Sequence, residues 1–202
     1  MKLESISLKN FKTFKSAELK NIPQMCVIVG ANGSGKSTLF DVFSFLKDAM
    51  MENVQQALNK RGGFKEVVSR GQEQDDIELS IQCRMPIADV LQNVTYQLRI
   101  TQKDKQPVIK REILRYERSV VSAPYHCLDF QYGKGYVMSD EDGLNPHSPA
   151  LERDEHRLDS PDILAIKGLG QFTRFKAANA FRKLIENWHH FDFHINRAQQ
   201  IP

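Results

Sequence analysis

Apolar and polar residues alternate at the start of the chain, where Leu3, Ile6 and Leu8 are among the apolar positions of residues 2–8. Alternation with a period of two is typical of a strand with one buried face. A polar turn over residues 9–14 and a second short apolar-polar run over residues 17–20 follow. The pattern therefore predicts two short strands separated by a turn.

The next apolar run, residues 25–29, has no polar interruption, and we expect it to be a buried strand. After a glycine-rich segment, Leu39, Val42 and Leu46 lie on one face at helical spacing. This pattern predicts a long helix that begins near Ser37 and continues past residue 51 towards residue 58. The glycine pair at residues 62–63 is expected to stop it, since glycine readily takes the left-handed conformation that closes helices.

From residue 71 the period returns to two, and the runs at residues 77–83, 94–100 and 109–116 predict an antiparallel meander. A further hairpin over residues 127–132 and 135–139, closed near Gly133, is expected to follow. We therefore expect residues 1–139 to form one α/β lobe.

Polar and acidic residues dominate residues 140–162, which predicts an exposed loop. Apolar residues return after it, and the spacing of Ala180, Phe181, Leu184 and Ile185 predicts a helix over residues 177–188. Residues 163–202 are thus expected to be a helical segment that leads towards a second lobe.

The glycine-rich segment between the apolar run and the helix has the residue types of a P-loop. Its glycines let successive backbone N–H groups face a phosphate, and the start of the helix adds a positive dipole. We expect Lys36 to reach the β- and γ-phosphates, Ser37 to ligate Mg²⁺ and Thr38 to help hold the α-phosphate. The predicted site for ATP and Mg²⁺ comprises Gly30, Ala31, Asn32, Gly33, Ser34, Gly35, Lys36, Ser37 and Thr38. A plain flexible turn is the alternative, but a predicted strand and helix flank the loop as a P-loop requires.

Composition narrows the class of protein only slightly. A formal net charge of +3 allows contact with nucleic acid without requiring it, and no apolar run has the length of a membrane span. We expect a cytoplasmic protein without a membrane partner. The cysteines Cys26, Cys83 and Cys127 are widely spaced, which favours buried free thiols over a disulfide or a zinc site.

The strand and turn at residues 2–14, the P-loop and the meander together resemble the first lobe of an ABC-type ATPase head. The similar group comprises the SMC, Rad50 and RecF proteins, and within it the RecF-like AAA ATPases that include OLD-family and anti-phage defence ATPases. Residues 61–71 and 169–172 also resemble segments of that group. The resemblance implies a P-loop NTPase fold with an antiparallel meander, a P-loop helix and a C-terminal helical segment.

The resemblance also implies roles for residues outside the P-loop. The turn residues Lys9, Asn10, Phe11 and Lys12 would contact the adenine and ribose side of ATP, Arg61 would reach the nucleotide, and Gln171 would sense Mg²⁺ and the attacking water. Each has a structural alternative: Phe11 buried in the core beside a polar turn, Arg61 a solvated residue at a helix end, and Gln171 an ordinary polar residue near a helix start.

Two motifs of such heads do not occur in the sequence: the LSGGQ-type signature loop and the apolar strand ending in Asp-Glu. The nearest acidic candidate, Asp129, lacks an acidic neighbour and is interpreted as a hairpin residue. The resemblance implies that a second lobe supplies both motifs and that two heads sandwich ATP. We therefore expect a missing C-terminal lobe and a second ATPase head, in a homo-oligomer, as partners.

Two other clusters of side chains each have a structural and a functional interpretation. His190 and His194, four residues apart with Asp192 between them, have a metal-binding spacing, but surface or interface histidines are favoured because no complete ligand set is visible. The basic residues Lys167, Arg174, Lys176, Arg182 and Lys183 suit DNA phosphate, or else form the solvated face of a helix.

Three hypotheses for the function follow. The first is an ATP-binding lobe that couples ATP binding and hydrolysis to DNA repair, chromosome maintenance or phage defence. The second is an ATP-controlled scaffold or sensor that assembles with a nuclease effector. The third is a self-contained P-loop phosphotransferase, which is disfavoured because no arginine-rich lid or acceptor site is recognisable.

Overall fold

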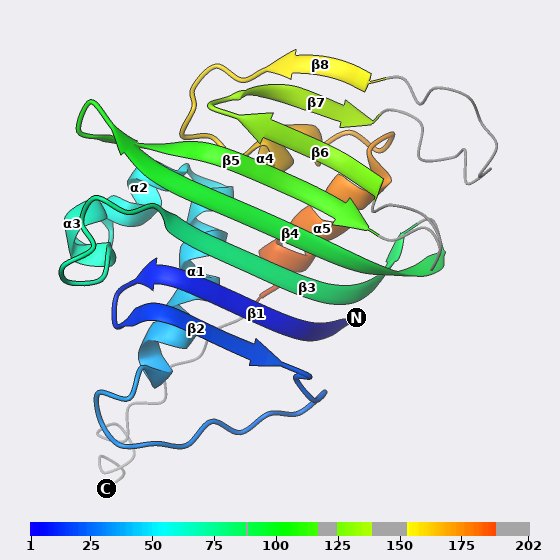
Figure 1. Ribbon diagram of the computed structural model, residues 1–202. Coiled ribbons are helices and arrows are strands. Elements are labelled where there is room, and N and C mark those ends of the chain that lie inside the picture. Colours follow the sequence, from blue (N-terminus) through cyan, green and yellow to red (C-terminus); the bar gives the residue numbers. More distant parts are fainter. Residues whose placement is uncertain (88, 117–124, 139–152, 189–202) are drawn as a thin grey trace, which may run out of the picture.

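One antiparallel sheet of eight strands forms the body of the protein in the order β2-β1-β3-β4-β5-β6-β7-β8 (Figure 1). The computed structural model describes residues 1–87, 89–116, 125–138 and 153–188. The strands are β1 Lys2–Phe11, β2 Phe14–Lys20, β3 Ile77–Ile87, β4 Val90–Lys103, β5 Gln106–Tyr116, β6 Tyr125–Gln131, β7 Lys134–Met138 and β8 Arg153–Arg157. The predicted meander is therefore confirmed, and its strands are longer than the sequence pattern indicated.

The long helices lie against a single face of this sheet (Figure 1). The helices are α1 Lys36–Met51, α2 Val54–Asn59, α3 Phe64–Val67, α4 Ala165–Leu169 and α5 Lys176–Glu186. We call the face that they cover the inner face and the opposite one the outer face. Inner-face side chains form one continuous apolar core with the helices, for example where the rings of Tyr96 and Phe181 lie 4.8 Å apart. Helix α5 confirms the helix expected in residues 177–188.

The hairpin of β1 and β2 is tighter than predicted. Strand β1 continues to Phe11, and Phe11 pairs with Phe14, so that only two residues remain for the turn. Asn10 and Lys12 take positive φ angles of 57° and 50°. Asparagine tolerates this region better than most residues do. The polar composition of residues 9–14 thus concealed the end of a strand.

The helix predicted from Ser37 to residue 58 is broken into α1 and α2, which corrects the prediction. Asn53 takes an extended conformation and caps α2, since its Oδ1 accepts a hydrogen bond from the N–H of Gln56 at 2.7 Å. The side chain of Lys167 donates to the carbonyls of Met51 and Glu52 at the end of α1. The predicted stop is confirmed: Gly63 has a φ of 94°, and its N–H donates to Leu58.

The acidic segment at residues 140–162 is not an exposed loop throughout. Its residues 153–157 form β8, which pairs with β7 at the edge of the sheet, and Asp162 is buried. The carbonyl of Asp162 accepts a hydrogen bond from Val54 at 2.9 Å. The apolar-polar pattern did not predict this strand, because an edge strand with a solvated face can consist mainly of charged residues. Residues 139–152 lie outside the described part of the chain.

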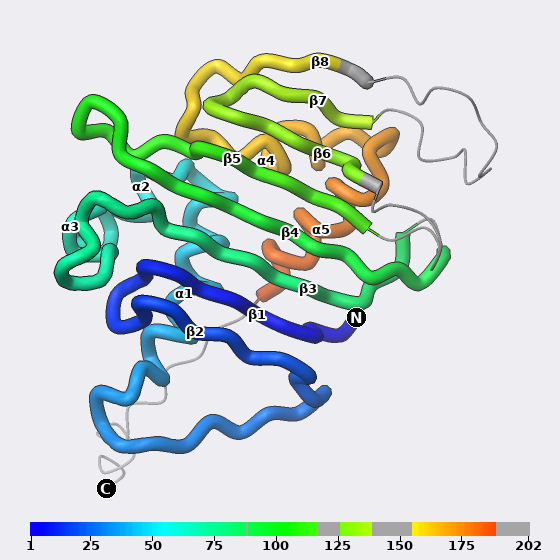
Figure 2. Tube along the Cα trace, in the orientation of Figure 1, coloured from blue at the N-terminus to red at the C-terminus, as the bar shows by residue number. Residues whose placement is uncertain are grey.

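The strand predicted at residues 25–29 is absent, and these residues form part of an extended loop that leaves the sheet between β2 and α1 (Figure 2). We call residues 25–29 the arm. The side chains of Met25, Val27 and Val29 are 83, 74 and 85% exposed. Cys26 is exposed as well, whereas Cys83 and Cys127 are buried as expected. A strand requires a neighbour for its backbone groups, and no described strand lies beside the arm.

Candidate nucleotide site

The glycine-rich loop bends where its glycines take conformations that other residues resist. Gly33 and Gly35 have φ angles of 81° and 94°, and Gly35 is the N-cap of α1. A Cβ atom at Gly35 would lie 2.6 Å from Cζ of Phe14, well inside contact distance. Only glycine therefore fits at this position, where the loop meets the β1–β2 hairpin.

The start of α1 has the properties of an anion site. The helix is 16 residues long and has no acidic residue in its first turn, so its unpaired N–H groups and positive dipole end face no competing carboxylate. The hydroxyl of Ser37 is on an exposed residue, and Lys36 follows the glycine cap directly. Backbone donors, a cation and a hydroxyl at a helix start are the groups that a polyphosphate with Mg²⁺ needs, and its binding by these residues stays a prediction.

The ammonium group of Lys36 lies among carbonyls of its own loop. Its Nζ atom donates to the carbonyl oxygens of Gly30 and Ala31, both at 2.7 Å, and lies 3.5 Å from Oγ of Ser34. The N–H of Ser34 in turn donates to the carbonyl of Ala31 at 3.3 Å. The loop is thus folded round the lysine that a phosphate would meet.

The turn between β1 and β2 lies beside the start of α1. The hydroxyl of Thr13 donates to that of Thr38 at 3.2 Å, and Nζ of Lys12 lies 2.5 Å from Oδ2 of Asp41. The structure therefore brings Lys12, which the resemblance implicated, to the P-loop helix. It does so through a contact with Asp41 that the sequence alone did not indicate.

The other turn residues point elsewhere. Asn10 is fully buried, and its amide donates to the carbonyls of Gln72 and Asp75 at 3.0 and 2.9 Å and accepts from the N–H of Ser69. Phe11 is buried as well and packs on Phe45, as the structural alternative anticipated. Both side chains thus make contacts within the folded chain, and their contact with a nucleotide stays a prediction.

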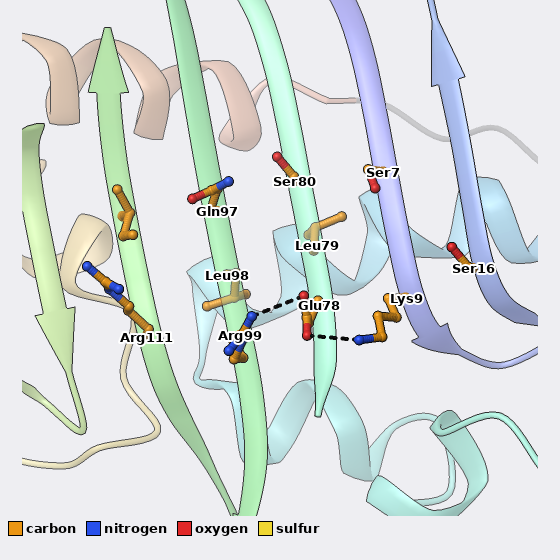
Figure 3. Close-up of a pocket in the computed structure, with 11 residues that line it drawn as sticks. Ser7, Lys9, Ser16, Glu78, Leu79, Ser80, Gln97, Leu98, Arg99 and Arg111 are labelled. Atoms are coloured by element: carbon orange, nitrogen blue, oxygen red, sulfur yellow. Dashed lines mark hydrogen bonds and ion pairs between the residues drawn. The ribbon is translucent and has the colours of Figure 1, made fainter. Parts of the chain in front are cut away.

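Lys9 lies on the outer face, where it pairs with Glu78 at 3.4 Å and Arg99 pairs with the same carboxylate at 3.2 Å (Figure 3). A pocket of about 270 Å³ on this face is lined by Ser7, Lys9, Ser16, Glu78, Leu79, Ser80, Gln97, Leu98, Arg99, Arg111 and Ile113. The sheet separates this pocket from α1. The outer-face pocket is therefore not part of the P-loop site.

Arg61 joins α1 to α2 by a set of short contacts. Its side chain is 8% exposed and donates to Asp41 at 2.9 Å, to Asp48 at 2.8 Å and to the carbonyl of Ala57 at 2.8 Å. Burial would raise the pKa of Asp48, but hydrogen bonds from Arg61 and Lys60 hold it below its usual value. A guanidinium with these partners has a structural role; its contact with a nucleotide stays a prediction.

Arg61→Ala is expected to lower the free energy of unfolding by about 2–4 kcal/mol, because it leaves two partly buried carboxylates without their shared cation. The affinity for Mg-ATP should stay unchanged. Urea unfolding and calorimetric titration test this. Lys60→Ala is the matched control, since its more exposed ammonium also pairs with Asp48 and its loss should cost far less. A large loss of ATP affinity in the Arg61 variant alone would support the nucleotide role.

Gln171 is exposed in the segment between α4 and α5, and its side-chain amide donates to the carbonyl of Lys167 at 3.3 Å. Helix α4, which precedes it, is held by Glu112 of β5. One carboxylate oxygen of Glu112 accepts from the N–H of Ala165 at 2.5 Å, and the other accepts from Ile166 and from the hydroxyl of Tyr96. The sensor role of Gln171 stays a prediction.

Glu112 was not among the predicted functional residues, although the sequence contains a signal for it. The residue falls in phase with Leu114 and Tyr116, which both face the core. A carboxylate at an inward position of a strand needs buried hydrogen-bond donors. Here the N-terminal N–H groups of α4 supply them.

The basic residues of the C-terminal segment have mostly local partners. The guanidinium of Arg174 lies 4.6 Å from the ring centre of Phe175, and Arg182 pairs with Glu186 at 2.8 Å. Lys183 is exposed. The histidines at 190 and 194 lie outside the described residues. Elsewhere, within the residues that the structure describes, no cluster of histidine, cysteine and acidic side chains has metal-binding geometry, and no helix has the length and apolarity to span a membrane.

Comparison with known protein families identifies the group to which the chain belongs. The family model described as an AAA ATPase domain matches residues 1–183. The chain belongs to the AAA ATPase domain family. This membership agrees with the P-loop NTPase fold and the RecF-like ATPase resemblance deduced from the sequence.

A curated relative is the DNA replication and repair protein RecF of Renibacterium salmoninarum, 26% identical over 217 residues. The alignment covers 100% of this chain and 50% of the relative, so the chain spans about half of that protein's length. A solved structure, described as "Structural biochemistry of ATP-driven dimerization and DNA stimulated activation of SMC ATPases", matches 54% of this chain and 68% of its own. The TM-score is 0.39, at 20% identity.

Proposed function

We propose that this AAA ATPase domain is the ATP-binding lobe of an SMC/RecF-like ATPase head. The observation that carries the proposal is the glycine cap at the start of α1, where Gly35 admits no side chain and Lys36 and Ser37 follow directly. Backbone N–H groups, a cation and a hydroxyl at a helix start are the means by which proteins hold a polyphosphate.

Each P-loop residue has a distinct task in this proposal. The N–H groups of residues 33–37 would bind phosphate oxygens, and Lys36 would leave its loop carbonyls to contact the β- and γ-phosphates. Ser37 would hold Mg²⁺, which neutralises developing charge on the phosphates when bound. Lys12, fixed by Asp41, would lie towards the nucleotide from the hairpin turn.

Hydrolysis would need groups from elsewhere. Asp129, the acidic residue nearest in pattern to a catalytic carboxylate, lies on β6 and is paired in a two-bond contact with Arg111, at 3.1 and 2.8 Å. It is therefore a structural residue. We propose that a second lobe and a second head complete the site and that this lobe alone binds ATP weakly and hydrolyses little, because positioned charges supply most phosphoryl-transfer catalysis.

The cellular role that we propose is action on DNA in repair, chromosome maintenance or phage defence, in the cytoplasm. The support is the similarity to RecF, whose name assigns that relative to DNA replication and repair. Binding to duplex DNA that weakens steeply with salt would support this role. ATP-dependent recruitment of a nuclease without affinity for DNA would instead favour the scaffold alternative.

The nucleotide proposal is tested by Lys36→Ala. Losing charge-assisted hydrogen bonds to phosphate should weaken Mg-ATP binding by roughly ten- to a hundredfold. Calorimetric titration measures the binding, and phosphate release measured alongside should stay low in both proteins. Lys65→Ala on α3 is the control and should bind like the wild type. Equal binding by the Lys36 variant contradicts the site, and rapid turnover by the wild-type chain contradicts the need for a second lobe.

A further inference from the structure

Two basic side chains share the carboxylate of Asp41 on α1. Its Oδ1 atom accepts from Nε of Arg61 at 2.9 Å, and its Oδ2 atom lies 2.5 Å from Nζ of Lys12. The Oδ2 atom is buried and, apart from this ion pair, has no hydrogen-bond partner among the described residues. A buried carboxylate oxygen requires a cation beside it, so the ammonium of Lys12 is held at this place.

The two cations are held to different degrees. Arg61 also donates to Asp48 and to the carbonyl of Ala57, and its side chain is 8% exposed. The side chain of Lys12 is 32% exposed, and Asp41 is its one charged partner in the part of the chain that the structure describes. Because an ammonium group has three N–H donors, Lys12 keeps donors for a ligand, whereas Arg61 does not.

Asp41 lies one helical turn beyond the residues that would meet phosphate. It follows Ser37 by four residues, and positions four apart share one face of a helix, about 6 Å apart along its axis. The turn that carries Lys12 lies along the same stretch of α1, where the hydroxyl of Thr13 donates to that of Thr38 at 3.2 Å. Lys12 therefore reaches Asp41 from a turn that is already docked on the P-loop helix.

We propose that Asp41 is a positioning residue for the nucleotide: it keeps the ammonium of Lys12 beside the first turns of α1, so that a second cation besides Lys36 is in place before a polyphosphate binds. The inference rests on the proposed nucleotide-binding function and adds a residue to it. A lysine side chain that is already ordered loses less rotational freedom on binding, which strengthens the affinity. Asp41 acts through Lys12 and does not contact the nucleotide.

A purely structural role is the competing explanation, because Asp41 also joins α1 to the end of α2 through Arg61. Asp48 provides the comparison that separates the two. It lies on the same helix, its side chain is 28% exposed, and its ion pairs are with Arg61 at 2.8 Å and Lys60 at 3.0 Å. Loss of either carboxylate removes one partner of Arg61, but only the loss of Asp41 releases Lys12.

The test is a double-mutant cycle on the full chain, with the affinity for Mg-ATP measured by calorimetric titration. The variants are Asp41→Asn, Lys12→Ala and the two combined, and thermal unfolding checks that each is folded at the temperature of the titration. Asp41→Asn is expected to weaken binding roughly three- to tenfold. It should have no further effect once Lys12 is replaced by alanine. The control Asp48→Asn should bind Mg-ATP like the wild type.

Acetylation of lysines, followed by mass spectrometry, tests the same contact without any substitution. Lys15 on the same hairpin is exposed and serves as the comparison. The ammonium of Lys12 should react several-fold more slowly than that of Lys15, because its pairing with Asp41 disfavours the reactive neutral amine. Mg-ATP should slow the reaction of Lys12 further and leave that of Lys15 unchanged.

Four results would overturn the role of Asp41: unchanged or tighter ATP binding by Asp41→Asn, an equal loss in Asp48→Asn, a loss that persists in full when Lys12 is alanine, or acetylation of Lys12 as fast as that of Lys15. In each case, weaker binding by Lys36→Ala would still support the nucleotide site. Absence of ATP binding by the wild type, with Lys12 nevertheless protected from acetylation, would instead overturn the proposed function and the positioning role with it.

Discussion

The variant Gly35→Ala is expected to lose Mg-ATP binding by roughly a hundredfold or more and to unfold at a lower temperature. Two penalties combine. An alanine at a φ of 94° costs about 1–2 kcal/mol of backbone strain, and its Cβ would lie 2.6 Å from Cζ and 2.7 Å from Cε1 of Phe14. The Phe14 ring must then turn aside, or the start of α1 must move and take with it the N–H groups that would hold phosphate. Calorimetric titration and thermal unfolding measure the two effects.

Gly33→Ala is the matched control for this prediction. Gly33 has a similar φ of 81°, but a Cβ there would meet nothing within 4 Å. It should therefore show the backbone strain without the clash against the Phe14 ring, and a much smaller loss of affinity. Equal losses in the two variants would show that the contact with Phe14 is unimportant to the site.

The second large expected effect is a loss of folding stability as the pH rises, and Glu112 is its cause. Burial raises the pKa of Glu112 from its ordinary value of 4.5 to about 7, against the hydrogen bonds from Ala165, Ile166 and Tyr96, which lower it. The folded protein then holds a proton that the unfolded chain has already released. Stability from this group is therefore fully present below pH 4.5 and is lost as the pH rises through about 7. The loss amounts to about 3 kcal/mol.

Glu112→Gln is expected to remove this fall in stability between pH 4.5 and 7. The amide cannot ionise, and its NH₂ group cannot accept from Ala165, so the variant should also be less stable by about 1–3 kcal/mol at pH 4.5, where the wild type still has its full stability. Urea unfolding at a series of pH values measures both. Glu78→Gln on the outer face serves as the control. An unchanged pH slope in the Glu112 variant would contradict a raised pKa at this residue.

Local patterns predicted the elements that depend on local causes. The cap at Gly35, the stop at Gly63 and the hairpin between β6 and β7 are determined by backbone angles that glycine allows, and glycine is visible in the sequence. The long meander strands followed from alternation because one face of each lies on the core. The P-loop itself could be read directly, since its chemistry needs contiguous residues.

The predictions that the structure contradicts were wrong for a different reason. The arm was predicted as a buried strand from its composition alone, but burial depends on a neighbour that the chain itself does not place there. The break between α1 and α2 was concealed because apolar spacing continues through Val54 and Leu58, although Asn53 is a good N-cap. The contacts of Arg61 and Asn10 join residues distant in sequence, so no local pattern could reveal them.

The two outermost strands of the sheet, β2 and β8, have one further consequence. Their exposed side chains include Lys15, Glu18 and Lys20 at one border and Glu155 and Arg157 at the other. Charged side chains along a border oppose the addition of another strand, because pairing would strip them of water. Copies of this protein at high concentration are therefore expected not to extend one another's sheets into fibres, despite free backbone groups at both borders.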